Sequence, residues 1–335
     1  MKLDFTKLGR VDADHINMLD KRKIPDLRKF DSDEMVQNIY HYTSVAGLQG
    51  ILSNKKLRFT HIEYMNDYNE VVVGEKLLRK AARDFGEEHA EMLDKQLIRE
   101  RKMNQDTFVC CFSMEKDSLS MWNYYTKDIN NQGYNIGIDY KSLVISILKK
   151  NPELLGCKML IGEVDNCKGD TNYANEMNMH SVKCITATLE LFTSIISGKP
   201  KEHNAENIAV VPTRVLRYHG EEGDFQYDHS LSIMYFMKRP CFSNEKEFRI
   251  VVDLTNEAIR KLKKNKKYGF RQSNGVLLPY IELEFDISCI TGITMSPTIK
   301  SDLAEKSIRK YCKYCGIDEE NLDEKIEMSS IPVRY

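Results

Sequence analysis

Short segments with strand character recur along the chain, but they do not alternate regularly with helices. The clearest is 133–140, in which every second residue from Tyr134 to Ile138 is apolar, as in a half-buried strand. Other segments rich in apolar, β-branched and aromatic residues predict strands at 36–42, 57–60, 107–113, 247–253, 277–285, 290–295 and near 325–328. A doubly wound parallel sheet needs regular βαβ alternation, so the sequence instead predicts an α+β fold of split antiparallel β-sheets surrounded by helices.

Helical spacing of apolar residues is found between several of these strands. The apolar positions from Val45 to Leu52 predict a helix, and Thr43 or Ser44 can cap its first turn, which makes the first unit strand, helix, strand. Further helices are expected at 71–101, in two parts separated by Gly86, and at 141–150, 181–196, 229–237 and 299–315.

The domain organisation follows from where this patterning is weak. Residues 1–35 carry many charges and few apolar positions, which predicts a peripheral N-terminal helical arm. Residues 36–335 are expected to form one domain, in which 151–232 is a partly helical insert. A chain of 335 residues with 41% hydrophobic content can bury a sizeable core.

Charge and hydropathy exclude some partners. The net charge of -1 gives no overall attraction to nucleic acid or to an anionic membrane. The N-terminus lacks the apolar core of a signal peptide, and no stretch approaches the roughly 18 apolar residues of a membrane span. We therefore expect a cytoplasmic protein with no membrane partner.

The nine cysteines are an odd set scattered through the chain, which favours reduced thiols over a disulfide framework. Cys110 and Cys111 lie in an apolar run and are expected in the core. Cys312 and Cys315 form a CxxC within an expected helix, but no second pair lies at zinc-finger spacing, so no metal is expected. The motifs GxGxxG, GxxxxGK(S/T), HExxH and GxSxG are also absent, which removes the simplest arguments for a Rossmann enzyme, P-loop NTPase, zinc protease or α/β-hydrolase.

Three short segments combine an expected strand end with polar or aromatic side chains that could hold a nucleotide: YHYTS at 40–44, MWNYY at 121–125 and EKEFR at 245–249. Together with LRF at 57–59, NDYNE at 66–70, FS at 112–113 and SSIPVR at 329–334, their order resembles a bacterial family catalogued as domain of unknown function 2971. The resemblance covers about 36–145 and 233–335, and it leaves the arm and the insert 151–232 outside as family-variable parts.

That family is in turn similar to ADP-ribosyltransferases, which bind NAD in a cleft between two small sheets and cleave its nicotinamide–ribose bond. The resemblance places His41 at the NAD-binding position of the first strand and Glu247 at the catalytic glutamate, with Glu245 as the first carboxylate of an ExE pair. A first-strand histidine is typical of the His-Tyr-Glu branch and an ExE pair of the Arg-Ser-Glu branch, so the subfamily stays open. NAD is the expected substrate.

The reaction gives Glu247 a physical role. Nicotinamide leaves NAD as a neutral molecule, but the ribose develops oxocarbenium character, which a carboxylate bound to its 2'-hydroxyl would stabilise. The alternative for Glu247 is a strand-surface carboxylate paired with Lys246 or Arg249. If extended, Glu245 shares a face with Glu247, and repulsion between them could raise the pKa of one, so that Glu245 acts as a base toward the acceptor. The alternative for Glu245 is a solvated turn residue.

The resemblance and the local chemistry also suggest residues that bind NAD. His41 could hydrogen-bond the adenosine ribose with help from Thr43, or it could be a satisfied structural histidine. The remaining candidates are aromatic faces, a cation and polar loop residues: Tyr42, Trp122 and Tyr125 for nicotinamide or adenine, Arg58 for the pyrophosphate, and Asn66 and Asp67 for the cleft wall. Their alternatives are a packed aromatic core, a surface salt bridge for Arg58, and helix capping for Asp67 and Asn69.

The basic run 260–267 near Arg271 could contact a nucleic-acid backbone, although a solvated loop is the simpler interpretation. The function expected from the resemblance is an NAD-dependent ADP-ribosyltransferase with a macromolecular acceptor, protein or nucleic acid. It would suit a bacterial toxin or antiphage effector with a partner or antitoxin protein. One alternative is an NAD glycohydrolase, and another is a catalytically inactive nucleotide- or protein-binding module.

Overall fold

The computed structural model describes residues 38–65, 106–126, 132–154, 157–166, 184–189, 208–212, 234–317 and 325–333, with single helical positions between 75 and 98. The expected arm 1–35 and most of the expected helical segment 71–101 lie outside these residues. No helix among the described residues is long and apolar enough to cross a membrane.

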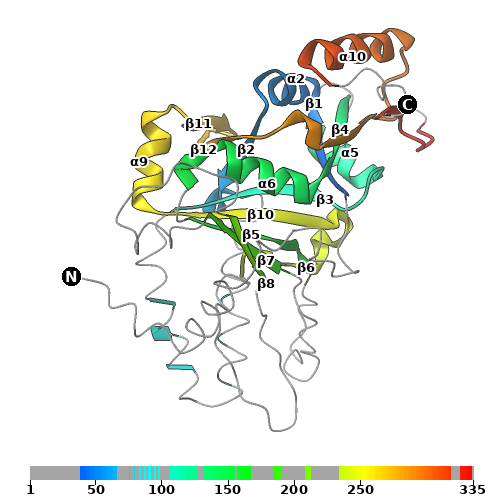
Figure 1. The fold of residues 1–335 in the computed structure, drawn as a ribbon. Coiled ribbons are helices and arrows are strands. Elements are labelled where there is room, and N and C mark those ends of the chain that lie inside the picture. Colours follow the sequence, from blue (N-terminus) through cyan, green and yellow to red (C-terminus); the bar gives the residue numbers. More distant parts are fainter. Residues whose placement is uncertain are drawn as a thin grey trace.

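A mixed, mostly antiparallel sheet is built on two central strands. Strands β3 (Asp106–Ser113) and β10 (Glu247–Leu254) pair along their full length. Beyond β10 the sheet continues through β5 (Lys158–Glu163), β7 (Cys184–Leu189) and β8 (Ile208–Pro212). The strands β5, β7 and β8 fall within the expected insert 151–232, and these three described strands extend the sheet (Figure 1).

The opposite edge of β3 is shared by two branches. The first branch runs through β1 (Asn38–Ser44), β4 (Gly133–Asp139), β13 (Ile290–Met295) and β14 (Ile326–Met328). The second runs through β2 (Lys56–His61), β12 (Val276–Glu284) and β11 (Tyr268–Ser273). Tyr40 of β1 pairs with Ser113, whereas Thr60 of β2 pairs with Val109. The sheet therefore forks beside residues 110–112.

Five helices are described around this sheet: α2 (Val45–Asn54), α5 (Leu119–Tyr125), α6 (Tyr140–Lys150), α9 (Asn256–Lys264) and α10 (Asp302–Cys315). Helix α6 crosses the face of β3 and β10, α9 lies beside the β11–β12 hairpin, and α2 and α10 lie together near β1 and β4 (Figure 1). The sequence-based prediction of an α+β protein is confirmed.

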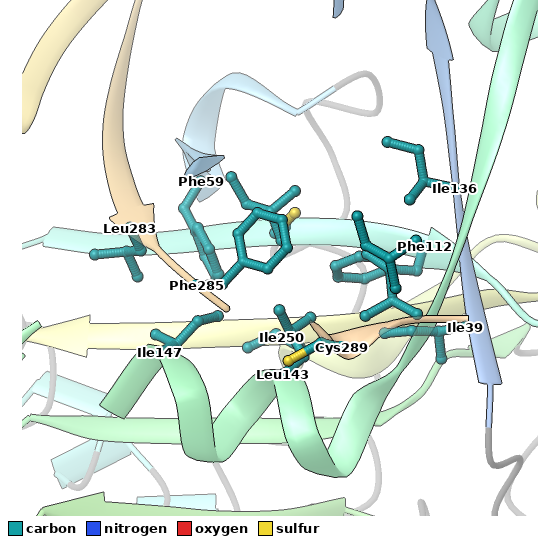
Figure 2. Packing of buried hydrophobic residues seen from close by; sticks show 14 of the residues in the cluster. Ile39, Phe59, Phe112, Ile136, Leu143, Ile147, Ile250, Leu283, Phe285 and Cys289 are labelled. Carbon is teal, nitrogen blue, oxygen red and sulfur yellow. The ribbon is translucent and has the colours of Figure 1, made fainter. Parts of the chain in front are cut away.

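The core lies between α6 and one face of the sheet. Leu143 and Ile147 of α6 point toward Ile250 of β10 and Phe59 of β2, and all four side chains are fully buried (Figure 2). Burying one such side chain contributes about 1.5–3 kcal/mol. Because successive strand residues face opposite sides, the alternate residues of β3 and β10 face away from this core.

Local capping explains several helix boundaries. The Ser44 side chain accepts a hydrogen bond from the Gly47 amide at 3.1 Å, which confirms the expected cap of α2. The helix ends at Lys55, which has a φ of 53°. Asp139 caps α6 in the same way, and Thr255 caps α9.

Three expectations from the sequence are wrong. The expected helix 181–196 contains β7, because Ile185, Thr186 and Thr188 are β-branched and its edges pair with β5 and β8. In the expected helix 229–237, residues 234–236 form a 3-10 turn, and the strand β9 (Met237–Lys238) follows.

The third correction concerns the basic run 260–267, which is helical as far as Lys264 and not a loop. Ala258, Ile259 and Leu262 give α9 a buried face, while the basic residues occupy its exposed side. Strand β11 follows and was not predicted, because its residues are exposed or half-buried and lack a regular apolar alternation.

Candidate functional site

A cleft of about 170 Å³ lies at the fork, on the side of β3 and β10 that faces away from the core. Both branches of the sheet contribute to it, together with β3, α5 and the segment before β10. The lining residues are Tyr40, His41, Tyr42, Arg58, Thr60, Tyr64, Met65, Val109, Cys110, Cys111, Phe112, Met121, Tyr125, Glu245, Glu247 and Arg271.

Glu247 is a buried carboxylate held by two cations. Its residue is 3% exposed, and Arg249 donates from Nε to Oε1 at 2.8 Å and from Nη2 to Oε2 at 2.9 Å. Lys238 donates from Nζ to Oε2 at 3.0 Å. Such a bidentate, charge-assisted arrangement fixes both the orientation and the ionised state of the carboxylate.

Glu245 joins the same network through Lys238. The Lys238 ammonium donates to Oε2 of Glu245 at 2.6 Å, and the Tyr125 hydroxyl donates to Oε1 at 2.9 Å. Burial raises the pKa of Tyr125, so its phenol keeps the proton that it donates. Lys238 lies in β9, which pairs with β6 (Asp165–Asn166), so its position between the two carboxylates is fixed by strand pairing.

The two carboxylates converge for a reason different from the one expected. Glu245 is the last residue of the 3-10 helix η8 (Pro240–Glu245), and Lys246, with a φ of 43°, separates it from β10. The two residues are therefore not on one strand, so the extended conformation that would place both on one face by strand alternation is not found. Lys238 brings them together instead.

The electrostatics of Glu247 follow from this arrangement. Burial opposes its ionisation, but the charges of Arg249 and Lys238 outweigh burial and lower the pKa of Glu247 to about 2. Repulsion from Glu245 does not raise the pKa of Glu247, because the Lys238 ammonium lies between the two carboxylates. Glu247 is thus a fixed negative charge at neutral pH and not an acid.

His41 fills the fork between the two branches. Its Nδ1 lies 3.1 Å from the carbonyl oxygen of Cys111, on the edge of β3 between β1 and β2. A carbonyl only accepts, so Nδ1 carries the proton, and burial lowers the pKa of His41, which keeps the ring neutral. Nε2 then has a lone pair that can accept a ligand hydroxyl.

Two aromatic candidates support the cleft wall. The Tyr42 hydroxyl donates to the Glu115 carbonyl at 2.9 Å and accepts from the Ser118 amide at 3.0 Å. The Trp122 indole N–H donates to Asp117 at 2.7 Å, and its ring meets Tyr42 edge-on with centroids 4.7 Å apart. Trp122 is 1% exposed and does not line the cleft. Its position agrees with the alternative in which the ring belongs to a packed aromatic core.

The other NAD-binding candidates occupy different places. Tyr125 lines the cleft beside Glu245, whereas Thr43 does not line it. Arg58 lines the cleft, and it also donates from Nε to Glu282 at 3.0 Å. It therefore combines the expected place in the cleft with the salt bridge that was its alternative. Asn66 and Asp67 lie outside the described residues.

Several residues of the site were missed or underestimated from sequence. Glu247 and Arg249 are two residues apart on β10 and therefore point to the same face of the strand. This spacing could have identified Arg249 as the partner of Glu247 beside the cleft and not only on the surface. Lys238 lies nine residues before Glu247 in a segment expected to be helical, and no sequence signal identifies it. Cys111 and Arg271 also line the cleft, and Cys111 is only half-buried.

No group of three histidine, cysteine or carboxylate side chains that could hold a metal ion is found within the described ranges. Comparisons with family models, curated proteins and solved structures find no match for this chain. The resemblance to domain of unknown function 2971 therefore stays a prediction from its motifs.

Proposed function

We propose that this protein is an NAD-dependent ADP-ribosyltransferase that transfers ADP-ribose to a macromolecular acceptor. The observation that carries the proposal is the ionised carboxylate of Glu247, buried at a cleft that opens where the sheet forks. His41 lies in the same fork, on the first strand. A cleft between two sheet branches, with a histidine on one side and a glutamate on the other, is the arrangement that the family resemblance implies.

The geometry suggests how the site would act on NAD. As nicotinamide departs, positive charge develops on the ribose, and a preorganised anion near it stabilises the transition state. Glu247 is already ionised and held rigidly by Arg249, so little reorganisation is needed. The Cys111 thiol also hydrogen-bonds Glu247, and a ribose hydroxyl could take its place.

The remaining polar groups have complementary roles. The neutral His41 would accept a ribose hydroxyl at Nε2 and hold the sugar against Glu247. Glu245, positioned by Lys238 and Tyr125, lies where it could orient an acceptor nucleophile. Water as the acceptor would make the protein an NAD glycohydrolase at the same site.

One observation favours a function of another class. Three hydrogen bonds from Arg249 and Lys238, with the Cys111 thiol as a fourth contact, occupy the acceptor positions of the nearly inaccessible Glu247 carboxylate. A carboxylate so fully engaged also suits a structural ion-pair network under a cleft that binds a nucleotide or protein without catalysis.

Nicotinamide release from NAD by the purified protein separates these functions. We expect release by the wild type, and a loss of about 10²–10³-fold in Glu247→Gln, as for other preorganised electrostatic contacts. Glu153→Gln is a matched control, because Glu153 is also a buried, lysine-paired carboxylate but lies outside the cleft.

The acceptor is tested by repeating the assay with a cell lysate. Release that requires lysate and is lost in Glu247→Gln supports transfer to a macromolecule, whereas release without lysate supports the glycohydrolase. NAD binding without release under any condition supports the inactive binding module. The toxin or antiphage setting, with an antitoxin or other partner, would then be tested by expressing both variants in bacteria.

A further inference from the structure

Two arginines reach the cleft from the second branch of the sheet. Arg58 is on β2 and Arg271 is on β11, and both line the cleft, although β12 lies between their strands. Arg58 pairs with Glu282 and Arg271 with Leu278. Glu282 and Leu278 are an even number of residues apart on β12, so the two arginines emerge on the same face of this branch.

An aromatic ring lies beside Arg58 on that face. The Arg58 guanidinium carbon is 4.7 Å from the ring centroid of Tyr280. The outer end of the Tyr280 ring lies over Gly269, where an added Cβ would approach it to 2.8 Å. Glycine at this position therefore leaves room for the ring, and the ring in turn supports Arg58.

Among the described residues, positive charge is in excess at the arginine end of the cleft. Glu282 accepts from Nε of Arg58 at 3.0 Å, which orients the guanidinium and leaves its Nη groups without a partner among the described residues. Arg271 has no carboxylate at salt-bridge distance in the described part of the chain. Arg271 is exposed, but partial desolvation and the neighbouring Arg58 lower its pKa, as expected when two cations lie close together.

Strand pairing shows how far the carboxylates Glu245 and Glu247 lie from the two arginines along the cleft. Glu247 pairs with Ser113 of β3 and Thr60 pairs with Val109, so about 13 Å of strand separates Glu247 from Thr60. Because β2 and β3 are antiparallel, Arg58 lies two residues from Thr60 toward Glu247, whereas Leu278, the partner of Arg271, lies on the far side of Thr60. Arg271 therefore lies farther from the carboxylates than Arg58. The two carboxylates are matched by Lys238 and Arg249, so they do not cancel the charge of the arginines.

We propose that Arg58 and Arg271 form a phosphate-binding end of the cleft, so that its ligand is a nucleotide with phosphates on the second branch. The position of the ribose between His41 and Glu247 rests on the proposed function, but the phosphate site does not. Guanidinium groups match phosphate oxygens through paired donors, and Thr60 lines the same wall. In NAD, the cationic nicotinamide would then face the carboxylates and the anionic diphosphate the arginines.

Isothermal titration calorimetry with ADP-ribose tests this site without requiring catalysis. We expect Arg271→Met to weaken ADP-ribose binding about tenfold or more, as for the loss of a charged hydrogen bond. Inorganic pyrophosphate should compete with ADP-ribose for the wild type. Arg260→Met is the matched control, since Arg260 is an exposed arginine on α9 that does not line the cleft, and it should bind like the wild type.

The outcomes separate this inference from the proposed enzyme. ADP-ribose binding that depends on Arg271, in a protein that releases no nicotinamide with or without lysate, supports the phosphate site and refutes the transferase. Nicotinamide release at low NAD concentration that is unchanged in Arg271→Met refutes the phosphate site alone. Absence of ADP-ribose binding by the wild type also overturns it, as does tighter, Arg271-dependent binding of a single-stranded oligonucleotide, which would assign the arginines to a polynucleotide.

Discussion

Replacing Lys238 by methionine should reveal how strongly the two cleft carboxylates depend on one ammonium. Lys238 is 3% exposed and contacts Glu245 at 2.6 Å and Glu247 at 3.0 Å. Removing it leaves two buried carboxylates close together with one cation fewer. Because breaking a buried pair leaves an uncompensated charge, we expect Lys238→Met to lower the free energy of unfolding by about 3–5 kcal/mol at pH 7.

The pH dependence of this loss follows from the pKa of Glu247. That pKa falls from 4.5 to about 2 on folding, which corresponds to about 3 kcal/mol at neutral pH. A lowered pKa gives stability that is present above pH 4.5 and is lost as the pH falls toward 2. In Lys238→Met the pKa of Glu247 rises, so less of this stability remains to be lost. The difference between the two proteins should therefore shrink in acid.

Urea denaturation at pH 7, 5 and 4 measures these differences, and a second substitution tests their cause. In the wild type, Glu245→Gln should lower the free energy of unfolding, because Lys238 and Tyr125 lose a charged partner. In the Lys238→Met background the same substitution should raise it, because one of two repelling carboxylates is neutralised. Equal effects of Glu245→Gln in both backgrounds would refute the reasoning, as would a Lys238→Met loss that does not change with pH.

Three other predictions concern the cleft wall and the core. Trp122→Phe removes the indole donor to Asp117 and should lower the free energy of unfolding by about 1–3 kcal/mol, measured in urea. Alkylation of Cys111, followed by mass spectrometry of its peptide, should be slowed by bound ADP-ribose, because its half-buried thiol lines the cleft and contacts Glu247; equal rates would contradict this placement. Phe248→Ala should cost about 3–5 kcal/mol in the same denaturation assay, since this ring is fully buried, and a loss below 1 kcal/mol would contradict its place in the core.

The strands of the central sheet could be predicted from local sequence because each combines β-branched or aromatic residues with clear boundaries. Segment 107–113 is β3, and 247–253 is nearly all of β10. Prediction failed where pairing and not local pattern decides the conformation. β7 was expected to be helical, but it is a strand between β5 and β8. β11, in which no residue is fully buried, is held in place by its pairing with β12.

The candidate site shows a similar division. Glu247 and His41 could be proposed from a resemblance in short motifs, and the structure places both at one cleft. Lys238 could not be predicted, because its position depends on the pairing of β9 with β6, which are far apart in sequence. The same long-range pairing explains why the pKa of Glu247 is lowered and not raised, since the Lys238 ammonium lies between the two carboxylates and the repulsion argument did not include it.

The network around Glu247 also determines how any loss of activity should be interpreted. Lys267 and Glu153 form a second buried ion pair, at 3.1 Å, which joins α9 and β11 to the turn after α6 and lies outside the cleft. Substitutions in the two networks remove similar charges from similarly buried places, so their costs in stability should be comparable. A loss of nicotinamide release or ADP-ribose binding that occurs in the cleft network alone can then be assigned to the site, because the second network controls for the stability of the fold.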